Sequence, residues 1–205
     1  MYLGGRKAEI RQMQYPDGHF FLSPEVFIPI IVFAFFSGVR YDVGVDHLAY
    51  VNEYEHLRIF GEYKNIDYDI GYNLVMFLFT RYQIHYVFFF LFLSFIQVVF
   101  IFWSFREERQ ILIYVGILLL LSFQYFFLMN GIKQGIAFCI FLYAIKFILE
   151  RRVFLYVLAI LLASTIHTSA LLLLPVYLFN PDNEREFMGA KLQLLLVAIT
   201  VYLGS

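Results

Sequence analysis

The chain of 205 residues is 61% hydrophobic and only 15% charged, and its mean hydropathy is +0.73. A soluble domain is about half apolar and about a quarter charged, so this composition excludes an ordinary soluble protein and predicts an integral membrane protein. The net charge of −1 argues against a nucleic-acid partner. The single cysteine, Cys139, excludes an intrachain disulfide.

The chain begins with a polar tail, residues 1–23, which lacks the apolar core of a cleavable signal peptide. A first helix is predicted from Pro24 to about Val39, because Ser23 suits an N-cap and proline suits the first helical position. A run over residues 190–205 is expected to begin a further span, because a crossing takes roughly 20 residues. Between these lie apolar runs at residues 84–105, 111–129, 132–149 and 153–179, the last interrupted by the polar sequence STIHTS.

Together these runs predict an all-α, polytopic integral membrane protein with about five to six transmembrane helices. We expect one transmembrane domain over residues 24–180, with an acidic external loop at residues 40–70. Within this loop residues 46–60 predict an amphipathic helix, with Asp46 at the N-cap and Tyr50, Tyr54 and Leu57 on one face. The next apolar piece, IGYNLVMFLF, is too short to cross and is expected to be re-entrant or interfacial.

The orientation follows from the basic residues of the short connections. Arg106 and Arg109 form one pair, Arg151 and Arg152 form another, and the N-terminal tail holds further bases. Cytoplasmic loops are enriched in lysine and arginine, so we expect these sets on the cytoplasmic side, with no crossing at residues 71–80. The acidic loop then lies outside the membrane.

This topology brings polar side chains from distant segments to the outer end of the bundle. His167 lies about 22 Å from Arg152 along a helix that rises about 1.5 Å per residue, which puts it in the outer leaflet. Arg40 and Lys133 fall at the same surface. We therefore expect Arg40 and His167 to line one outward-opening cavity, with Asp46 at its rim.

Each of these residues has a structural and a functional interpretation. Arg40 can balance a helix dipole, whereas its planar fork also suits bidentate binding of phosphate. Asp42 and Asp46 can serve loop solvation and helix capping, or one of them can be a general base for a sugar hydroxyl. Lys133 can reach the interface or provide a second cation for a pyrophosphate, and Gln134 can link helices.

His167 favours function more strongly, because ionisable residues within a membrane are rare and usually face a cavity or the bundle interior. Its hydroxyl-bearing neighbours are Ser164, Thr165, Thr168 and Ser169, and such a belt can also satisfy an imidazole without any chemistry. The other histidines show no metal-ligand spacing. The sequence has no P-loop, dinucleotide fingerprint or nucleophile elbow, so neither a metal nor a cofactor is predicted.

The stretch RYDVGVDHLAY, residues 40–50, resembles the Arg-x-x-x-Gly-x-Asp-x-x-x-Tyr region of the EpsG family, which groups with Wzy-type polysaccharide polymerases. The following DIGYNLVMFLF is similar to the next piece of those proteins. MNGIKQGIAFCIFLYAIKFI and RRVFLYVLAILLASTIHTSALLLLP resemble their Arg-Gln-containing helix and their His-x-Ser-Ala helix. This resemblance extends over about residues 27–179.

The resemblance implies a bacterial glycosyltransferase at the outer face of the cytoplasmic membrane. Such an enzyme transfers a growing glycan from its polyprenyl pyrophosphate to a lipid-linked repeat unit of O-antigen, capsule or exopolysaccharide. Its expected partners are these lipid-linked oligosaccharides, the bilayer and other polysaccharide assembly proteins. The implied site residues are Arg40, Lys133 and Gln134 for the pyrophosphate, Asp46 or His167 as the base, and Asp42 and Tyr50 as further candidates.

The sequence departs from the family pattern in three places. Lys133 stands where the family usually has arginine, a polar tail precedes the first span where members commonly carry another span, and usual members continue beyond residue 205. Two other functions stay open, namely a transporter or flippase of lipid-linked saccharides and a non-catalytic membrane component of an assembly complex. A transporter would favour an internal repeat, and none is visible in the sequence.

Overall fold

The computed structural model describes residues 17–63 and 69–178, and within them helix is the only regular secondary structure. This confirms the all-α prediction. The predicted run at residues 190–205 and most of the polar tail lie outside the described residues. The elements are η1 Asp17–Leu22, α2 Pro24–Val39, α3 His47–Phe60, α4 Ile70–Arg81, α5 Tyr86–Ser104, η2 Arg109–Ile111, α6 Leu112–Leu121, α7 Gln124–Asn130, α8 Ile132–Leu149, α9 Val153–Ile166 and η3 Thr168–Leu178.

Two of the described helices, α5 and α8, are long and apolar enough to cross a membrane. The bent pair formed by residues 109–121 and α7 makes a third candidate if it counts as one span. The helices α2, α9 and η3 are apolar but shorter. The chain is therefore a membrane protein by its helices, and the count of five to six crossings stays a prediction.

The sequence shows one apolar run over residues 111–129, but the prediction of a single helix there is wrong. The chain bends by 65° between α6 and α7. Ser122 has an extended backbone, with φ −93° and ψ 165°, at the point where the two helices separate. Serine offers the backbone local alternatives to helical hydrogen bonds, and an apolar periodicity alone does not register such a break.

The polar sequence STIHTS, which interrupts the apolar run at residues 153–179, coincides with a helix end that the sequence did not predict. The helix α9 ends at Ile166, and His167 has an extended backbone with φ −150° and ψ 112°. The chain then continues as the 3-10 helix η3. His167 is thereby held at a helix end rather than inside a regular helix.

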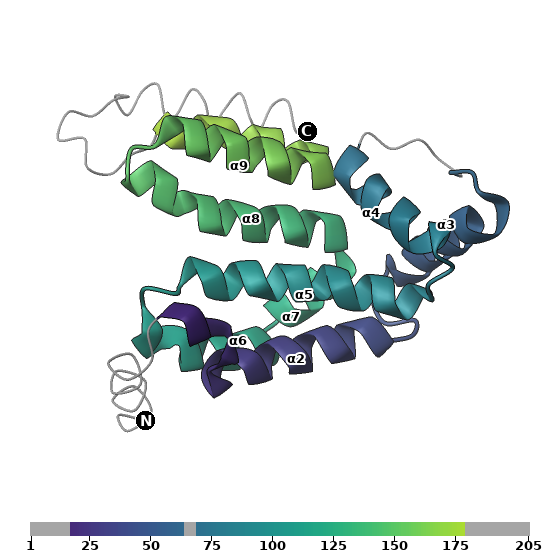
Figure 1. Cartoon of the computed structure of the whole chain (residues 1–205), viewed down its shortest axis with the longest axis horizontal. Helices are drawn as coiled ribbons and strands as arrows, with labels where there is room; N and C mark the ends of the chain where they lie inside the picture. The colour runs from purple at the N-terminus through teal and green to yellow at the C-terminus, as the bar shows by residue number, and fades with distance from the viewer. Residues whose placement is uncertain (1–16, 64–68, 179–205) are drawn as a thin grey trace.

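The helices α2, α5, α8 and α9 lie side by side, with α5 between α2 and α8 (Figure 1). Their alternating directions bring the connections at residues 105–109 and 150–152 to one end of the bundle. The C-terminus of α2, the α7–α8 junction and the C-terminus of α9 lie at the opposite end. The pairs of arginines therefore lie at the end opposite to Arg40, Lys133 and His167.

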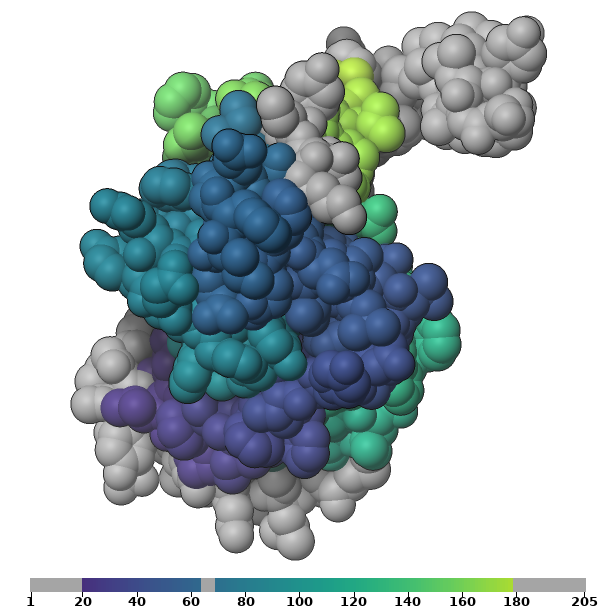
Figure 2. All heavy atoms as spheres, turned by 90° about the vertical axis from the view of Figure 1, so that its right-hand side faces the viewer, coloured from purple at the N-terminus to yellow at the C-terminus, as the bar shows by residue number. Residues whose placement is uncertain are grey.

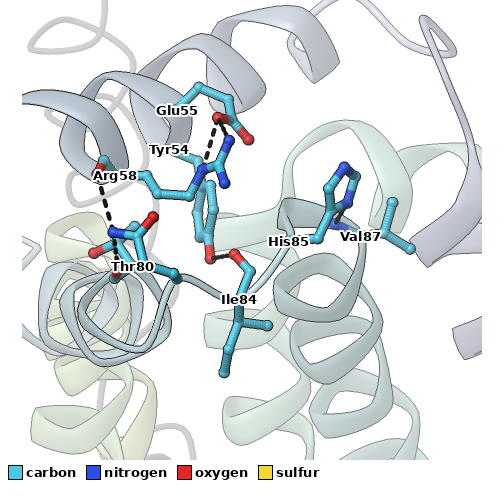
Figure 3. A network of polar contacts seen from close by, with 8 residues as sticks. Tyr54, Glu55, Arg58, Thr80, Ile84, His85 and Val87 are labelled. Carbon is cyan, nitrogen blue, oxygen red and sulfur yellow. Dashed lines mark hydrogen bonds and ion pairs between the residues drawn. The ribbon is translucent and has the colours of Figure 1, made fainter.

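The helix α3 covers the second end of the bundle, and Figure 2 shows its atoms across the centre of that face. Tyr54 and Leu57 are buried and Tyr50 is half-buried, which confirms the predicted apolar face. Tyr54 Oη donates a hydrogen bond of 2.7 Å to the carbonyl of Ile84, in the connection between α4 and α5 (Figure 3). Buried aromatic packing and this bond fix α3 against the bundle.

Candidate functional site

A first group of buried polar residues surrounds Arg40, which directly follows α2 and is only 6% exposed. Its Nη1 donates to Ser37 Oγ at 3.0 Å, its Nε donates to His47 Nδ1 at 3.2 Å, and its Nη2 donates to the carbonyl of Met129. Ser37 in turn shares a hydrogen bond of 2.5 Å with Ser94 on α5. We call these residues, Ser37, Arg40, His47, Ser94 and Met129, the Arg40 centre.

The described residues that hold the Arg40 guanidinium are neutral. Its centre also lies 5.8 Å from the ring of Phe90, a cation–π distance. Among the described residues no carboxylate forms an ion pair with it. Burial lowers the pKa of Arg40 to about 10, so the side chain keeps its positive charge at neutral pH. The molecule thus contains a buried cation whose described partners carry no negative charge.

His47 accepts the Nε–H of Arg40 and must therefore be unprotonated at Nδ1 in this arrangement. Burial and the neighbouring guanidinium lower the pKa of His47, and the Asp42 carboxylate opposes them only in part. The Nε2 atom of this buried ring has no hydrogen-bond partner among the described residues. The neutral imidazole is consequently the stable form beside Arg40.

The junction between α7 and α8 is anchored by polar groups from two other segments. Asn130 Oδ1 accepts the backbone N–H of Asp46 at 3.0 Å. Gln97 Nε2, on α5, donates to the carbonyls of Leu128 and Ile132 at 3.1 Å and 3.2 Å. Gly44 has a φ of +98°, and a Cβ there would lie 2.8 Å from Asn130 Oδ1. This glycine therefore permits the tight turn that brings the loop onto the junction.

A second buried group surrounds Asp69, which directly precedes α4 and is 5% exposed. Its Oδ1 accepts the backbone N–H and the hydroxyl of Thr168 at 2.9 Å and 3.0 Å. Its Oδ2 lies 3.3 Å from Lys133 Nζ and 3.7 Å from His167 Nδ1. We call Asp69, Lys133, His167 and Thr168 the Asp69 centre.

Charges compensate each other within the Asp69 centre. Burial alone raises the pKa of Asp69, but the two bonds from Thr168 and the ammonium of Lys133 outweigh it, so the pKa lies below its usual value. Lys133 is 7% exposed, and its Nζ also lies 4.5 Å from the centre of the Tyr72 ring. The Asp69 carboxyl is consequently ionised at neutral pH.

The two centres meet at one stretch of chain, residues 129–133. Arg40 binds the carbonyl of Met129, and Lys133 follows four residues later, in the first turn of α8. The Tyr50 ring lies 6.3 Å from the Tyr72 ring and within the electrostatic field of both centres. Burial raises the pKa of Tyr50, and the charge of Lys133 opposes this effect. Tyr50 therefore lies near charged groups of both centres.

The structure thus brings Arg40, Lys133, His167 and Tyr50 to one end of the bundle. Asp46 directly precedes α3, half-buried, as the predicted N-cap residue, but its side chain makes no capping hydrogen bond.

Two further predicted residues, Asp42 and Gln134, are exposed and belong to neither centre. The Gln134 side-chain oxygen lies beside Gly131, on the exposed side of the junction.

Sequence reasoning missed Asp69 and Gln97. Asp69 is one of several acids in the external loop, and its position next to the apolar sequence IGYNLVMFLF was the available signal. Gln97 is an amide within the 19 residues of the apolar helix α5, and such residues often link transmembrane helices. Among the described residues no group of three or more His, Cys, Asp or Glu side chains is arranged to hold a metal ion.

A comparison with protein-family models matches residues 26–205 to the EpsG family. The chain belongs to the EpsG family. The match extends from the first span to the last residue and so goes beyond the region of about residues 27–179 that the motifs suggested. No curated protein and no solved structure matches the chain. EpsG membership, together with the apolar helices, makes this a membrane protein of a bacterial family associated with polysaccharide biosynthesis.

Proposed function

We propose that this EpsG-family protein is a polysaccharide polymerase. It transfers a glycan from polyprenyl pyrophosphate to a hydroxyl group on the end sugar of a lipid-linked repeat unit. The observation that carries the proposal is the buried Arg40 guanidinium, which has no described carboxylate partner and lies at the same end of the bundle as a second buried cation, Lys133. A leaving pyrophosphate needs such cations.

Arg40 is suited to an anion that arrives with the substrate. Its three described hydrogen bonds orient the guanidinium and leave part of its donor fork for a ligand. An electrostatic contact is stronger in a desolvated site than in water, and a planar fork matches two phosphate oxygens at once. In this proposal the Ser37, His47 and Met129 contacts hold Arg40 ready for the pyrophosphate.

Lys133 adds a second positive charge four residues beyond Met129, in the first turn of α8. Because Asp69 already balances this ammonium, we assign it a weaker contact with the pyrophosphate than that of Arg40. The exposed Gln134 is placed to offer an amide donor to the same head group, and the exposed Asp42 to meet the carbohydrate. Tyr50 interacts electrostatically with both cations and is a further candidate for substrate contact.

The reaction needs a group that accepts a proton. The acceptor hydroxyl transfers its proton to the base, and its oxygen forms a bond to the anomeric carbon. The bond from that carbon to the pyrophosphate oxygen breaks, and its electron pair leaves with the polyprenyl pyrophosphate. His167 and Asp46 are the two candidate bases, and the neighbouring buried carboxylate of Asp69 favours His167.

We place the site at the outer face of the bacterial cytoplasmic membrane. This follows from the exposed arginines Arg106, Arg151 and Arg152 at the opposite end of the bundle, because cytoplasmic loops are enriched in such residues. Cysteines introduced at the exposed Asn52 and the exposed Glu107 test the orientation. An impermeant thiol reagent added outside should label the first and not the second, and the reverse pattern would contradict the placement.

The polymerase assignment is tested with purified protein, one defined lipid-linked repeat unit and no nucleotide sugar. We expect glycans of increasing length and the release of one polyprenyl pyrophosphate for each bond formed. Repeat units that cross a vesicle membrane without lengthening would instead support a flippase. Neither lengthening nor crossing, in the presence of the other assembly proteins, would support a non-catalytic component.

A further inference from the structure

We infer that Asp69 is a positioning residue that orients the His167 imidazole for proton transfer. This inference rests on the proposed polymerase function and names the carboxylate through which its base is held. Asp69 lies 99 residues before Thr168 in the sequence, yet its carboxylate contacts both Thr168 and His167. The pairing is therefore made by the fold and not by a local motif.

The two oxygens of Asp69 have different partners. Oδ1 is fixed by the backbone N–H and the hydroxyl of Thr168, the residue that follows His167. These bonds tie the carboxylate to the backbone that carries the imidazole. Oδ2 is thereby directed toward His167 Nδ1, 3.7 Å away, and toward Lys133 Nζ, 3.3 Å away.

The backbone around His167 is shaped for this contact. The helix α9 ends at Ile166, one residue before His167. The backbone N–H of His167 donates the last hydrogen bond of this helix to the carbonyl of Ala163 at 3.0 Å. The helices α4 and α9 approach closely at Gly71, where a Cβ would lie 2.5 Å from Thr165 Oγ1. A side chain larger than hydrogen at position 71 would separate the carboxylate from the imidazole.

Among the described residues, the charged and titratable groups around His167 come from three elements, and one of them is α3, whose Tyr50 interacts electrostatically with Asp69 and Lys133. Asp69 precedes α4, and Lys133 belongs to α8. Tyr72 on α4 contacts Lys133 through its ring. The other titratable residues described on α8, α9 and η3 lie away from this end, apart from the uncharged thiol of the buried Cys139. The charge balance at His167 therefore depends chiefly on one carboxylate and one ammonium.

This arrangement gives the imidazole nitrogens separate tasks. Nδ1 lies 3.7 Å from the carboxylate and makes no hydrogen bond among the described residues, so the nearby negative charge is what favours a proton on that atom. The lone pair of Nε2 is then left to accept the proton of the sugar hydroxyl. The His167 side chain is 25% exposed, whereas Asp69 and Lys133 are nearly sealed, so His167 is the member that a substrate can reach. Asp69 stays ionised and stabilises the imidazolium until its proton is released.

The pairing can be measured without any substrate, by NMR titration of protein containing labelled histidine. A His167→Gln variant identifies the His167 signal. In Asp69→Asn the loss of the negative charge should move the His167 midpoint to lower pH. In Lys133→Gln the loss of the positive charge should move it to higher pH, each by roughly a unit. The signal of the exposed His85 should not move in either variant and serves as the control.

A misfolded variant would not produce shifts of opposite sign. Unchanged His167 midpoints in both variants would overturn the inference. If the wild-type protein polymerises, the acid limb of each variant's pH–rate profile should move relative to wild type in the same direction as its His167 midpoint. An unmoved limb would also overturn the inference. Midpoints that shift as expected in a protein that neither polymerises nor binds the repeat unit would overturn the proposed function and leave the pairing intact.

Discussion

The charged side chains Arg40, Asp69 and Lys133 are similarly buried, but the Arg40 centre and the Asp69 centre compensate charge in opposite ways. Arg40 is surrounded by hydroxyl, imidazole and carbonyl acceptors and by an aromatic ring, all of them uncharged. Lys133 is paired with a carboxylate that has further donors of its own. One centre therefore holds a net positive charge in the absence of substrate, whereas the described groups of the other nearly balance.

This difference indicates a division of tasks. A buried cation oriented by neutral acceptors gains most from an anion brought by a ligand, because no internal ion pair must be broken first. A balanced carboxylate–ammonium pair beside an imidazole is better suited to setting the direction and the proton affinity of that imidazole. We therefore assign pyrophosphate binding mainly to Arg40 and proton transfer mainly to the Asp69 centre.

The largest effect is expected for Arg40→Gln, which removes the positive charge. Polymer formation should fall by roughly 10²- to 10³-fold, the usual effect of removing one donor to a developing anion. The rate of polymerisation by purified protein measures this loss. The matched control is Arg58→Gln, whose arginine pairs with Glu55 on the surface of α3 and should leave the rate unchanged. An equal loss in both variants would show that any arginine removed from this region is harmful.

A double-mutant cycle measures how strongly Asp69 and Lys133 are coupled in their contribution to the free energy of unfolding. Asp69→Asn removes the negative charge of the buried Asp69–Lys133 pair, and Lys133→Met removes its positive charge, so each should lower the free energy of unfolding by about 3–5 kcal/mol. The double variant should recover most of this loss. Denaturant titration in detergent measures the cycle. Losses that simply add would mean that the Asp69–Lys133 pair contributes no coupling.

A smaller effect is expected for Gly71→Ala. The new Cβ would lie 2.5 Å from Thr165 Oγ1, so α4 must shift from α9, at a cost of about 1–3 kcal/mol for such overpacking. The adjacent Ile70→Ala is the control, because Ile70 is 73% exposed. Thermal unfolding in detergent compares the two variants. A Gly71→Ala protein as stable as the control would contradict the close approach of α4 and α9.

The smallest effect concerns the protonation of His47. Its pKa is lowered in the folded protein, so folding favours the neutral ring, and this stability is present above the ordinary value of 6.5 and is lost as the pH falls below it. Protonation at Nδ1 also removes the bond from Arg40, worth about 0.5–1.5 kcal/mol. His47→Asn should flatten the dependence of unfolding on pH below 6.5. An identical pH dependence in both proteins would contradict the neutral assignment.

Much of the helical framework could be predicted from the sequence, because its boundaries are set locally. Pro24 begins α2, and Gly131 precedes α8, as predicted. The bend at Ser122 was missed because both flanking segments are equally apolar.

The candidate site, like the fold, could be predicted only in part. The order of the spans predicted that Arg40, Lys133 and His167 share one end. The sequence could not distinguish Asp69 from the other loop acids, because only its tertiary contacts with Thr168 and Lys133 do so.

The most direct test compares binding with turnover, using labelled polyprenyl pyrophosphate and purified wild-type, Arg40→Gln and Asp69→Asn proteins. The account predicts that Arg40→Gln weakens binding by about tenfold or more, the effect of losing a charge-assisted contact of about 1.4 kcal/mol or more. We expect Asp69→Asn to bind as tightly as wild type or more tightly, because the Asp69 carboxylate no longer offsets the charge of Lys133, yet to fail to elongate the glycan. Binding that survives in Arg40→Gln and is lost in Asp69→Asn would contradict the division of tasks.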